Sequence, residues 1–76
     1  MTRARNRIEG LALAIKRARR AAELAHDDLV RKPSEENRDA AVSANQTRIL
    51  LESELRAACL DDMALISDIM RWADGR

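Results

Sequence analysis

The sequence contains no phenylalanine or tyrosine, one tryptophan, one cysteine, two glycines and one proline among its 76 residues. Because Cys59 is the only thiol, no disulfide can form within the chain, and a reducing compartment is favoured. His26 and Cys59 are the only soft metal ligands, whereas a structural zinc site needs four such side chains. A domain this small is marginally stable without disulfides or a metal. We therefore expect no metal and no cofactor, and we expect a partner chain to stabilise the fold.

Long apolar runs are also missing. No stretch approaches the roughly 20 apolar residues that a membrane-spanning helix needs. The first five residues carry two arginines, but no apolar segment follows them, which argues against a cleavable secretory signal. Hydrophobic residues make up 46% and charged residues 36%, a composition typical of a folded chain rather than a disordered one. The sequence predicts a cytoplasmic protein with no membrane contact.

Catalytic motifs are lacking as well. The sequence has no phosphate-binding loop, metal-binding motif or nucleophile elbow. His26 has no orienting acid, because Asp27 and Asp28 are its immediate neighbours and point to other sides of a helix. Cys59 has no Cys-x-x-Cys context to activate its thiol. We predict no catalytic residue, and we do not expect the protein to be an enzyme.

The residues that are abundant, namely alanine, leucine, arginine and glutamate, favour helices. One segment, Arg-Lys-Pro-Ser over residues 31–34, interrupts them. Pro33 disfavours helix in the residue before it. Ser34 is a good helix N-cap, and the two glutamates after it suit the positive end of a helix dipole. We predict a turn over residues 32–34.

Amphipathic helices are predicted on both sides of this turn, over about residues 3–31 and about residues 35–73. In the first, apolar residues recur at alternating spacings of four and three, the heptad pattern of a coiled coil. The second continues the pattern with interruptions at Arg48 and Asp62. So short a turn makes the helices antiparallel. We predict an all-α fold, a single helical-hairpin domain of two antiparallel helices, with the second helix the longer.

The second helix has an alternative form. Asp61 and Asp62 are residues that favour N-caps, so the helix can break there and a short third helix can follow. No glycine or proline lies nearby to mark a break, and the continuous helix is the main prediction.

A continuous second helix extends to about 58 Å against about 43 Å for the first, at 1.5 Å per residue. The part from Ile66 onward then overhangs the first helix, and its apolar side chains are exposed. Such clusters mark interaction sites, and methionine and tryptophan are enriched at interfaces. If the helix breaks near Asp61, this row instead folds back and becomes core. The predicted partner-binding residues are Leu51, Leu55, Met63, Ile66, Ile69, Met70 and Trp72.

Basic residues crowd the start of the chain, where residues 1–20 contain seven against one acidic residue, Glu9. The net charge is only +1, and no aromatic residue interleaves the cluster to stack on bases. We expect most of this charge to be solvated or compensated. The alternative is a hairpin that dimerises into a four-helix bundle and binds RNA phosphates. The candidate nucleic-acid residues are Arg3, Arg7, Arg17 and Arg20.

Three segments suggest a family. The chain opens Met1-Thr2, continues with Arg-Ile-Glu-Gly-Leu at residues 7–11, and has Leu-Glu-Ser-Glu-Leu at residues 51–55 after a charged turn. This pattern resembles the small type III secretion needle co-chaperones. The resemblance implies a cytoplasmic helical hairpin that pairs with a tetratricopeptide-like chaperone and keeps the needle subunit unpolymerised. The proline turn also resembles the needle subunits themselves. The chain departs from the co-chaperones in that turn and in its extension beyond Ala58.

The leading functional hypothesis is therefore a protein-interaction module. Its hairpin would dock on a helical partner through spaced apolar anchors and mask surface that would otherwise polymerise. Self-association, RNA binding and a role as the needle subunit itself stay open as alternatives.

Overall fold

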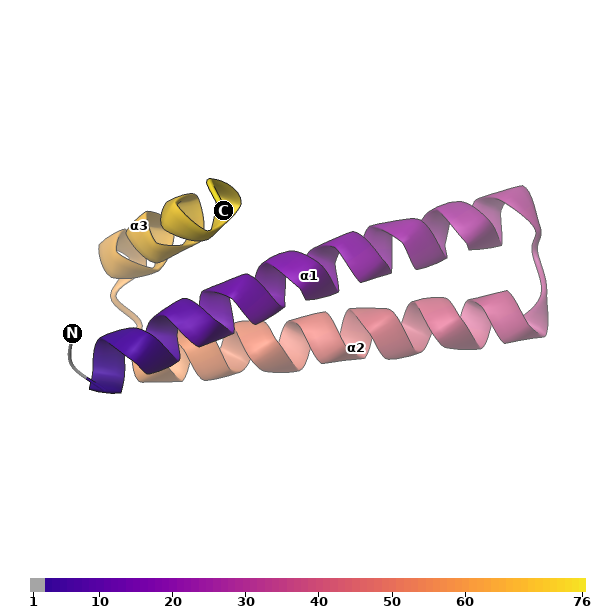
Figure 1. Cartoon of the computed structure of the whole chain (residues 1–76). Coiled ribbons are helices and arrows are strands. Elements are labelled where there is room, and N and C mark those ends of the chain that lie inside the picture. Colours follow the sequence, from indigo (N-terminus) through magenta and orange to yellow (C-terminus); the bar gives the residue numbers. More distant parts are fainter. Residues whose placement is uncertain (1–2) are drawn as a thin grey trace.

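Residues 3–76 are described by the computed structural model, and they form three helices and no strand. The helices are α1 (Arg3–Arg31), α2 (Glu35–Ala58) and α3 (Met63–Asp74). In Figure 1, α1 and α2 lie side by side and run in opposite directions, while α3 lies beside the N-terminal half of α1. The molecule is elongated and measures 45 × 22 × 19 Å. The prediction of an all-helical chain is confirmed.

The turn between α1 and α2 forms where the proline segment predicts it. Ser34 is the N-cap of α2, and its hydroxyl accepts a hydrogen bond from the backbone N–H of Asn37 at 3.1 Å. The side chain of Asn37 reaches back to donate to the Lys32 carbonyl at 2.8 Å. Both contacts satisfy backbone groups that a helix end leaves unpaired. The turn is therefore held by local hydrogen bonds as well as by Pro33.

The main prediction for the second half of the chain, one helix over residues 35–73, is wrong. The helix ends at Ala58, and the backbone of Leu60 and Asp61 turns left-handed, with φ values of 53° and 57°. Leu60 N–H donates to the Ala57 carbonyl at 3.1 Å, and Asp61 N–H donates to the Arg56 carbonyl at 2.8 Å. These are the two bonds of a Schellman motif, which closes a helix even without the usual glycine.

A third helix then begins, as the alternative reading near Asp61 predicts. Asp62 is its N-cap, and Oδ1 of Asp62 accepts from the backbone N–H groups of Ala64 and Leu65 at 3.1 and 3.2 Å. The helix runs for 12 residues to Asp74. The break is thus a helix stop followed directly by a helix start.

The predicted overhang is also wrong, because α3 folds back along α1. Ile69 and Ala73 are fully buried, and Met70 is 9% exposed. Burying an isoleucine or methionine side chain is worth about 1.5–3 kcal/mol, a gain that α3 would lose if it projected into solvent. The core cluster consists of Ile8, Ala12, Ile15, Leu55, Cys59, Ile69, Met70 and Ala73.

The three helices divide the molecule into two ends. All buried side chains of the described part lie in residues 5–18 and 51–76, which we call the core end. Residues 19–50 form the arm, the part of the hairpin that projects beyond α3 in Figure 1. In the arm no side chain is buried, and the seam between the helices is lined mainly by half-buried alanine.

Candidate protein-interaction surfaces

The described part of the chain contains no assembled chemical centre. Among the side chains that the structure describes, no three His, Cys, Asp or Glu residues are grouped as a metal site, and no polar or charged side chain is buried. In the same part, every helix is too short or too polar to cross a membrane.

Cys59 is packed in the core cluster with 3% of its surface exposed. Burial raises the pKa of the Cys59 thiol above its ordinary value of 9.0, and the nearby Asp62 carboxylate raises it further. A buried thiol with a raised pKa is a poor nucleophile. Cys59 therefore serves as a small apolar side chain of the core.

The structure separates the residues predicted to bind a partner. Leu55, Ile69 and Met70 are buried, so in this conformation they hold the fold and are closed to a partner. Leu51, Ile66 and Trp72 are half-buried and pack against the same core, and Arg76 lies over the Trp72 ring at 4.8 Å. Only Met63 is largely exposed, at 62%.

Four of the seven residues meet at a groove between α2 and α3. The hollow has a volume of about 180 Å³. Its floor includes Ile15 of α1. Its other lining residues are Arg19, Glu52, Leu55, Arg56, Met63, Ile66 and Met70. The groove exists because α3 packs mainly on α1 and barely touches α2.

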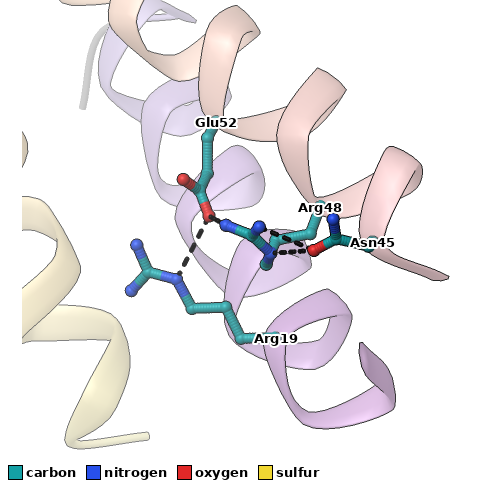
Figure 2. A network of polar contacts seen from close by, with 4 residues as sticks. All are labelled: Arg19, Asn45, Arg48 and Glu52. Carbon is teal, nitrogen blue, oxygen red and sulfur yellow. Dashed lines mark hydrogen bonds and ion pairs between the residues drawn. The ribbon is translucent and has the colours of Figure 1, made fainter. Parts of the chain in front are cut away.

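A polar network marks the boundary between the core end and the arm (Figure 2). Glu52 of α2 accepts from Arg19 Nε of α1 at 3.5 Å and from Arg48 Nη1 at 2.8 Å. Arg48 also donates from Nε and Nη2 to Asn45 Oδ1, at 3.1 and 2.6 Å. Arg48, which interrupts the heptad pattern, is thus held between two neighbours on α2.

The arm carries most of the large apolar residues that are exposed in the described part of the chain. Five of the seven large apolar residues that are exposed lie in it: Leu24, Val30, Val42, Ile49 and Leu50. Their exposed fractions run from 47% to 68%. The sequence analysis missed these five residues because it predicted exposed apolar side chains only in the overhang from Ile66 onward. The signal that could have identified them is that each lies outside the heptad seam between the two helices.

A second groove runs along the arm between α1 and α2. It has a volume of about 390 Å³ and is lined by Ala22, His26, Leu29, Arg38, Ala41, Val42 and Asn45. The helical repeat places this groove on the side of the hairpin that α3 covers at the core end, which we call the α3 face. Lys16 of α1 lies on the α3 face, because its side chain donates hydrogen bonds to the backbone carbonyls of Ala73 in α3 and of Arg76 after α3. Val30 lies two heptads after Lys16 and therefore on the same side of α1.

The same relation holds on α2. Arg56 lines the groove below α3, and Ile49 and Val42 lie one and two heptads before it. Residues one heptad apart share a side of a helix. The α3 face is therefore covered at the core end and open along the arm.

The candidate nucleic-acid residues do not form one site. The side chain of Arg3 is outside the described residues. Arg7 is exposed and lies apart from the others. Arg17 and Arg20 line a hollow of about 510 Å³ together with Leu13, Lys16 and Arg76. Arg20 pairs with Glu23 at 3.4 Å, so part of the positive charge is compensated locally.

Comparisons with protein families, curated proteins and solved structures give no match to this chain.

Proposed function

We propose that this chain is a non-enzymatic protein-interaction module whose arm receives a helix of a partner protein on the α3 face. The proposal rests on one observation: the α3 face, which α3 covers at the core end, continues uncovered along the arm. Over the core end, α3 covers this face, and along the arm the same face exposes Val30, Val42 and Ile49 beside a groove.

A helix is the occupant that this geometry favours. The groove lies between two helices and continues the layer of a third, so a partner helix in line with α3 would pack as α3 does. Helix-in-groove recognition uses apolar anchors at helical spacing. The exposed residues of the arm offer such a row, because Val42 and Ile49 lie one heptad apart. The anchoring side chains would bury apolar surface that the isolated arm leaves in water.

A more specific role follows from the sequence resemblance. We propose that the chain acts in the cytoplasm as a co-chaperone of a type III secretion needle subunit, paired with a tetratricopeptide-like chaperone. In this role the arm masks apolar surface that would otherwise polymerise. The resemblance supports this role, and so does the helical-hairpin arrangement of α1 and α2. The scarcity of aromatic residues makes the needle subunit itself the weaker alternative.

The test is co-purification from the source cell with three tagged baits. Wild type is expected to retain a stoichiometric helical partner, and Val42→Glu is expected to lose it, because a carboxylate would enter the groove. Leu50→Arg is the control, since Leu50 is also exposed but points about 80° away from Val42 around α2, toward the side of the hairpin that α3 does not cover. The proposal fails if wild type elutes without a partner, or if Val42→Glu and Leu50→Arg reduce binding equally.

A second candidate function is nucleic-acid binding, favoured by the hollow that Lys16, Arg17, Arg20 and Arg76 surround. Phosphate contacts release counterions, so such binding should weaken steeply as salt rises. A gel shift at low salt with duplex and hairpin RNA tests it. Loss of the shift in an Arg17→Gln/Arg20→Gln double variant supports this candidate, and no shift at micromolar protein removes it.

A further inference from the structure

We propose that the surface of α1 that α3 covers also accepts the α3 of a second copy of this chain, so that two copies exchange their third helices. This inference goes beyond the proposed function, which concerns the arm. In the exchanged dimer, residues 59–62 would be helical and would join α2 and α3 into one continuous helix. Each α3 would then lie on the α1 of the other copy.

The contacts of α3 are divided unequally between the other two helices. Ile69, Met70 and Ala73 are its buried residues and belong to the core cluster. The helix packs mainly on α1 and barely touches α2, to which it is joined by the short segment 59–62. Its packing is therefore mainly with α1, whereas its link to α2 is mainly covalent. An α3 that belongs to another copy can make the same contacts with α1.

The connecting segment is strained in the closed form, in which α3 lies on the α1 of its own chain. Leu60 and Asp61 have φ values of 53° and 57°, in the left-handed region that is unfavourable for residues other than glycine. Leu60 is also 88% exposed, so packing of its side chain does not offset this strain. In a continuous helix both residues would take ordinary helical φ values. Short connecting segments under strain favour this kind of exchange, known as domain swapping.

The sequence of the connecting segment is compatible with a continuous helix. Residues 59–62 are Cys-Leu-Asp-Asp and include neither glycine nor proline, the residues that most disfavour a helix. The heptad pattern of α2 also passes through the segment without a change of phase. Its positions, spaced alternately by four and three residues, are Leu51, Leu55, Ala58, Asp62, Leu65, Ile69 and Trp72. Apart from Asp62, the joined helix would carry one unbroken apolar row.

A continuous helix places α3 beyond the α1 of its own chain. In Figure 1, α2 ends beside the start of α1, and α3 turns back to run along α1. Without this turn, the 12 residues of α3 would extend about 18 Å past the start of α1. Ile69, Met70 and Ala73 would then lie in water, which is unfavourable for apolar side chains. The α1 of a second copy, uncovered by the same change, offers the surface that these residues fit.

A two-fold axis perpendicular to the long direction of the hairpin permits both exchanges at once. In the closed form α3 runs in the direction of α1 (Figure 1), and in the continuous helix it would run in the direction of α2. The axis reverses the second copy, so that the α1 of that copy runs in the direction of the first copy's α2. Each α3 therefore meets the other α1 in the orientation of the closed form. The core ends would meet end to end, and the arms would project in opposite directions.

Protein concentration decides between the closed and the exchanged forms. The short segment 59–62 gives α3 a high effective concentration at its own α1, so the closed monomer prevails in dilute solution. Exchange replaces two contacts within chains by two equivalent contacts between chains and relieves the strain in both copies. The dimer is therefore expected to appear as the concentration rises.

The first test is sedimentation equilibrium of the full chain at concentrations up to roughly 1 mM, which detects even a weak dimer. Wild type is expected to contain a dimer fraction that grows with concentration. Leu60→Gly should raise the dimer Kd at least about tenfold, because glycine takes the left-handed backbone without strain and disfavours the continuous helix. Circular dichroism checks that the variants keep their helices.

Two further variants separate the backbone effect from the loss of a side chain. Leu60→Ala is the matched control, because it removes the same exposed side chain but favours a helix, so it should not raise the Kd. Asp62→Ala should lower the Kd, because it removes the N-cap that starts α3 and supplies a residue that favours the continuous helix.

Cross-linking tests whether the helices have exchanged. Arg17 of α1 and Arg76 after α3 line the same hollow, so cysteines at these two positions lie close together wherever an α3 lies on an α1. Two Cys59→Ala chains, one with Arg17→Cys and one with Arg76→Cys, are mixed at a concentration that populates the dimer and treated with a short bismaleimide. A covalent heterodimer is expected. Neither chain alone should cross-link to itself, because identical positions lie far apart in an end-to-end dimer.

Three results would each overturn the proposal. Wild type could stay monomeric at roughly 1 mM, Leu60→Ala could weaken the dimer as much as Leu60→Gly, or the mixed chains could give no covalent heterodimer. None of them bears on the proposed function, because the arm takes no part in the exchange and its test reads out Val42.

Discussion

The core end and the arm are made from the same two helices, yet they differ in almost every physical respect. In the core end, the third helix seals α1, and residues such as Ile15 and Ile69 are completely buried. In the arm, two helices meet along a half-buried alanine seam, and large apolar residues such as Val30 and Leu50 remain 68% and 66% exposed.

The difference shows where stability and recognition are located. Buried apolar area stabilises a fold, and every apolar side chain that is buried among the described residues lies in the core end. A two-helix arm without buried side chains adds little and keeps its apolar surface available. We infer that the core end maintains the fold, and we propose that the arm carries the surface that binds a partner.

The largest expected effect comes from comparing two isoleucines. Ile69→Ala in the core end should lower the free energy of unfolding by about 2–5 kcal/mol, because it removes a fully buried side chain and leaves a cavity. Ile49→Ala in the arm makes the same chemical change at a position 49% exposed and should cost less than about 0.5 kcal/mol. Urea titrations of both variants measure the difference. Equal losses would show that the arm contributes to the core.

A smaller effect is expected at the break that creates α3. Asp62→Ala removes the N-cap acceptor of two backbone N–H groups and should cost about 1 kcal/mol, within the 0.5–2 kcal/mol range for such caps. Asp61→Asn is the control, because it removes only an exposed ion pair with Arg56 and keeps a residue that tolerates a left-handed backbone. Thermal melts followed by circular dichroism compare them. A larger loss for Asp61→Asn would contradict the assigned cap.

A gain in stability is expected from a substitution at Leu60, which has a left-handed backbone two residues before the N-cap of α3. Leu60 has φ of 53° and is 88% exposed, so its side chain strains the backbone and buries almost nothing. Leu60→Gly should raise the free energy of unfolding by up to about 1 kcal/mol, because relief of left-handed strain exceeds the extra entropy of glycine in the unfolded chain. Urea titration measures this change. A loss of stability would indicate that Leu60 packs on the fold.

The smallest effect at neutral pH concerns Cys59. Its pKa is raised in the folded chain, so the folded state holds the proton more tightly than the unfolded state does. The thiol's contribution to stability is complete below the ordinary value of 9.0 and is lost as the pH rises above it. Wild type should therefore lose stability relative to Cys59→Ala between neutral pH and pH values above 9. A constant difference between the two over this range would show that the thiol is not buried.

The first half of the fold is readable from the sequence because its signals are local. Pro33 and Ser34 define a turn through backbone chemistry that needs no tertiary contact. The end of α2 is harder, because Leu60 and Asp61 adopt left-handed backbones that residues other than glycine seldom take. Only the capping preference of Asp61 and Asp62 marks that site, which is why the sequence predicts the break as an alternative and not as the main form.

The candidate surfaces were less predictable, for a reason that follows from the break. A heptad row identifies apolar residues but does not say which helix covers them. Once α3 folds back, Ile69 and Met70 change from predicted contacts to core, whereas Met63 at the start of the helix stays exposed. The apolar side chains of the arm are exposed because α3 is too short to reach them, and this depends on the tertiary arrangement of the helices.

Residue-resolved hydrogen exchange along α1 of the purified chain tests the central claim most directly. Amides between Ile8 and Ala18 should exchange only through global unfolding, and amides between Ala22 and Val30 should exchange at least about tenfold faster through local opening of the arm. Uniform protection from Ile8 to Val30 would contradict the account, because it would make the arm as stable as the core end.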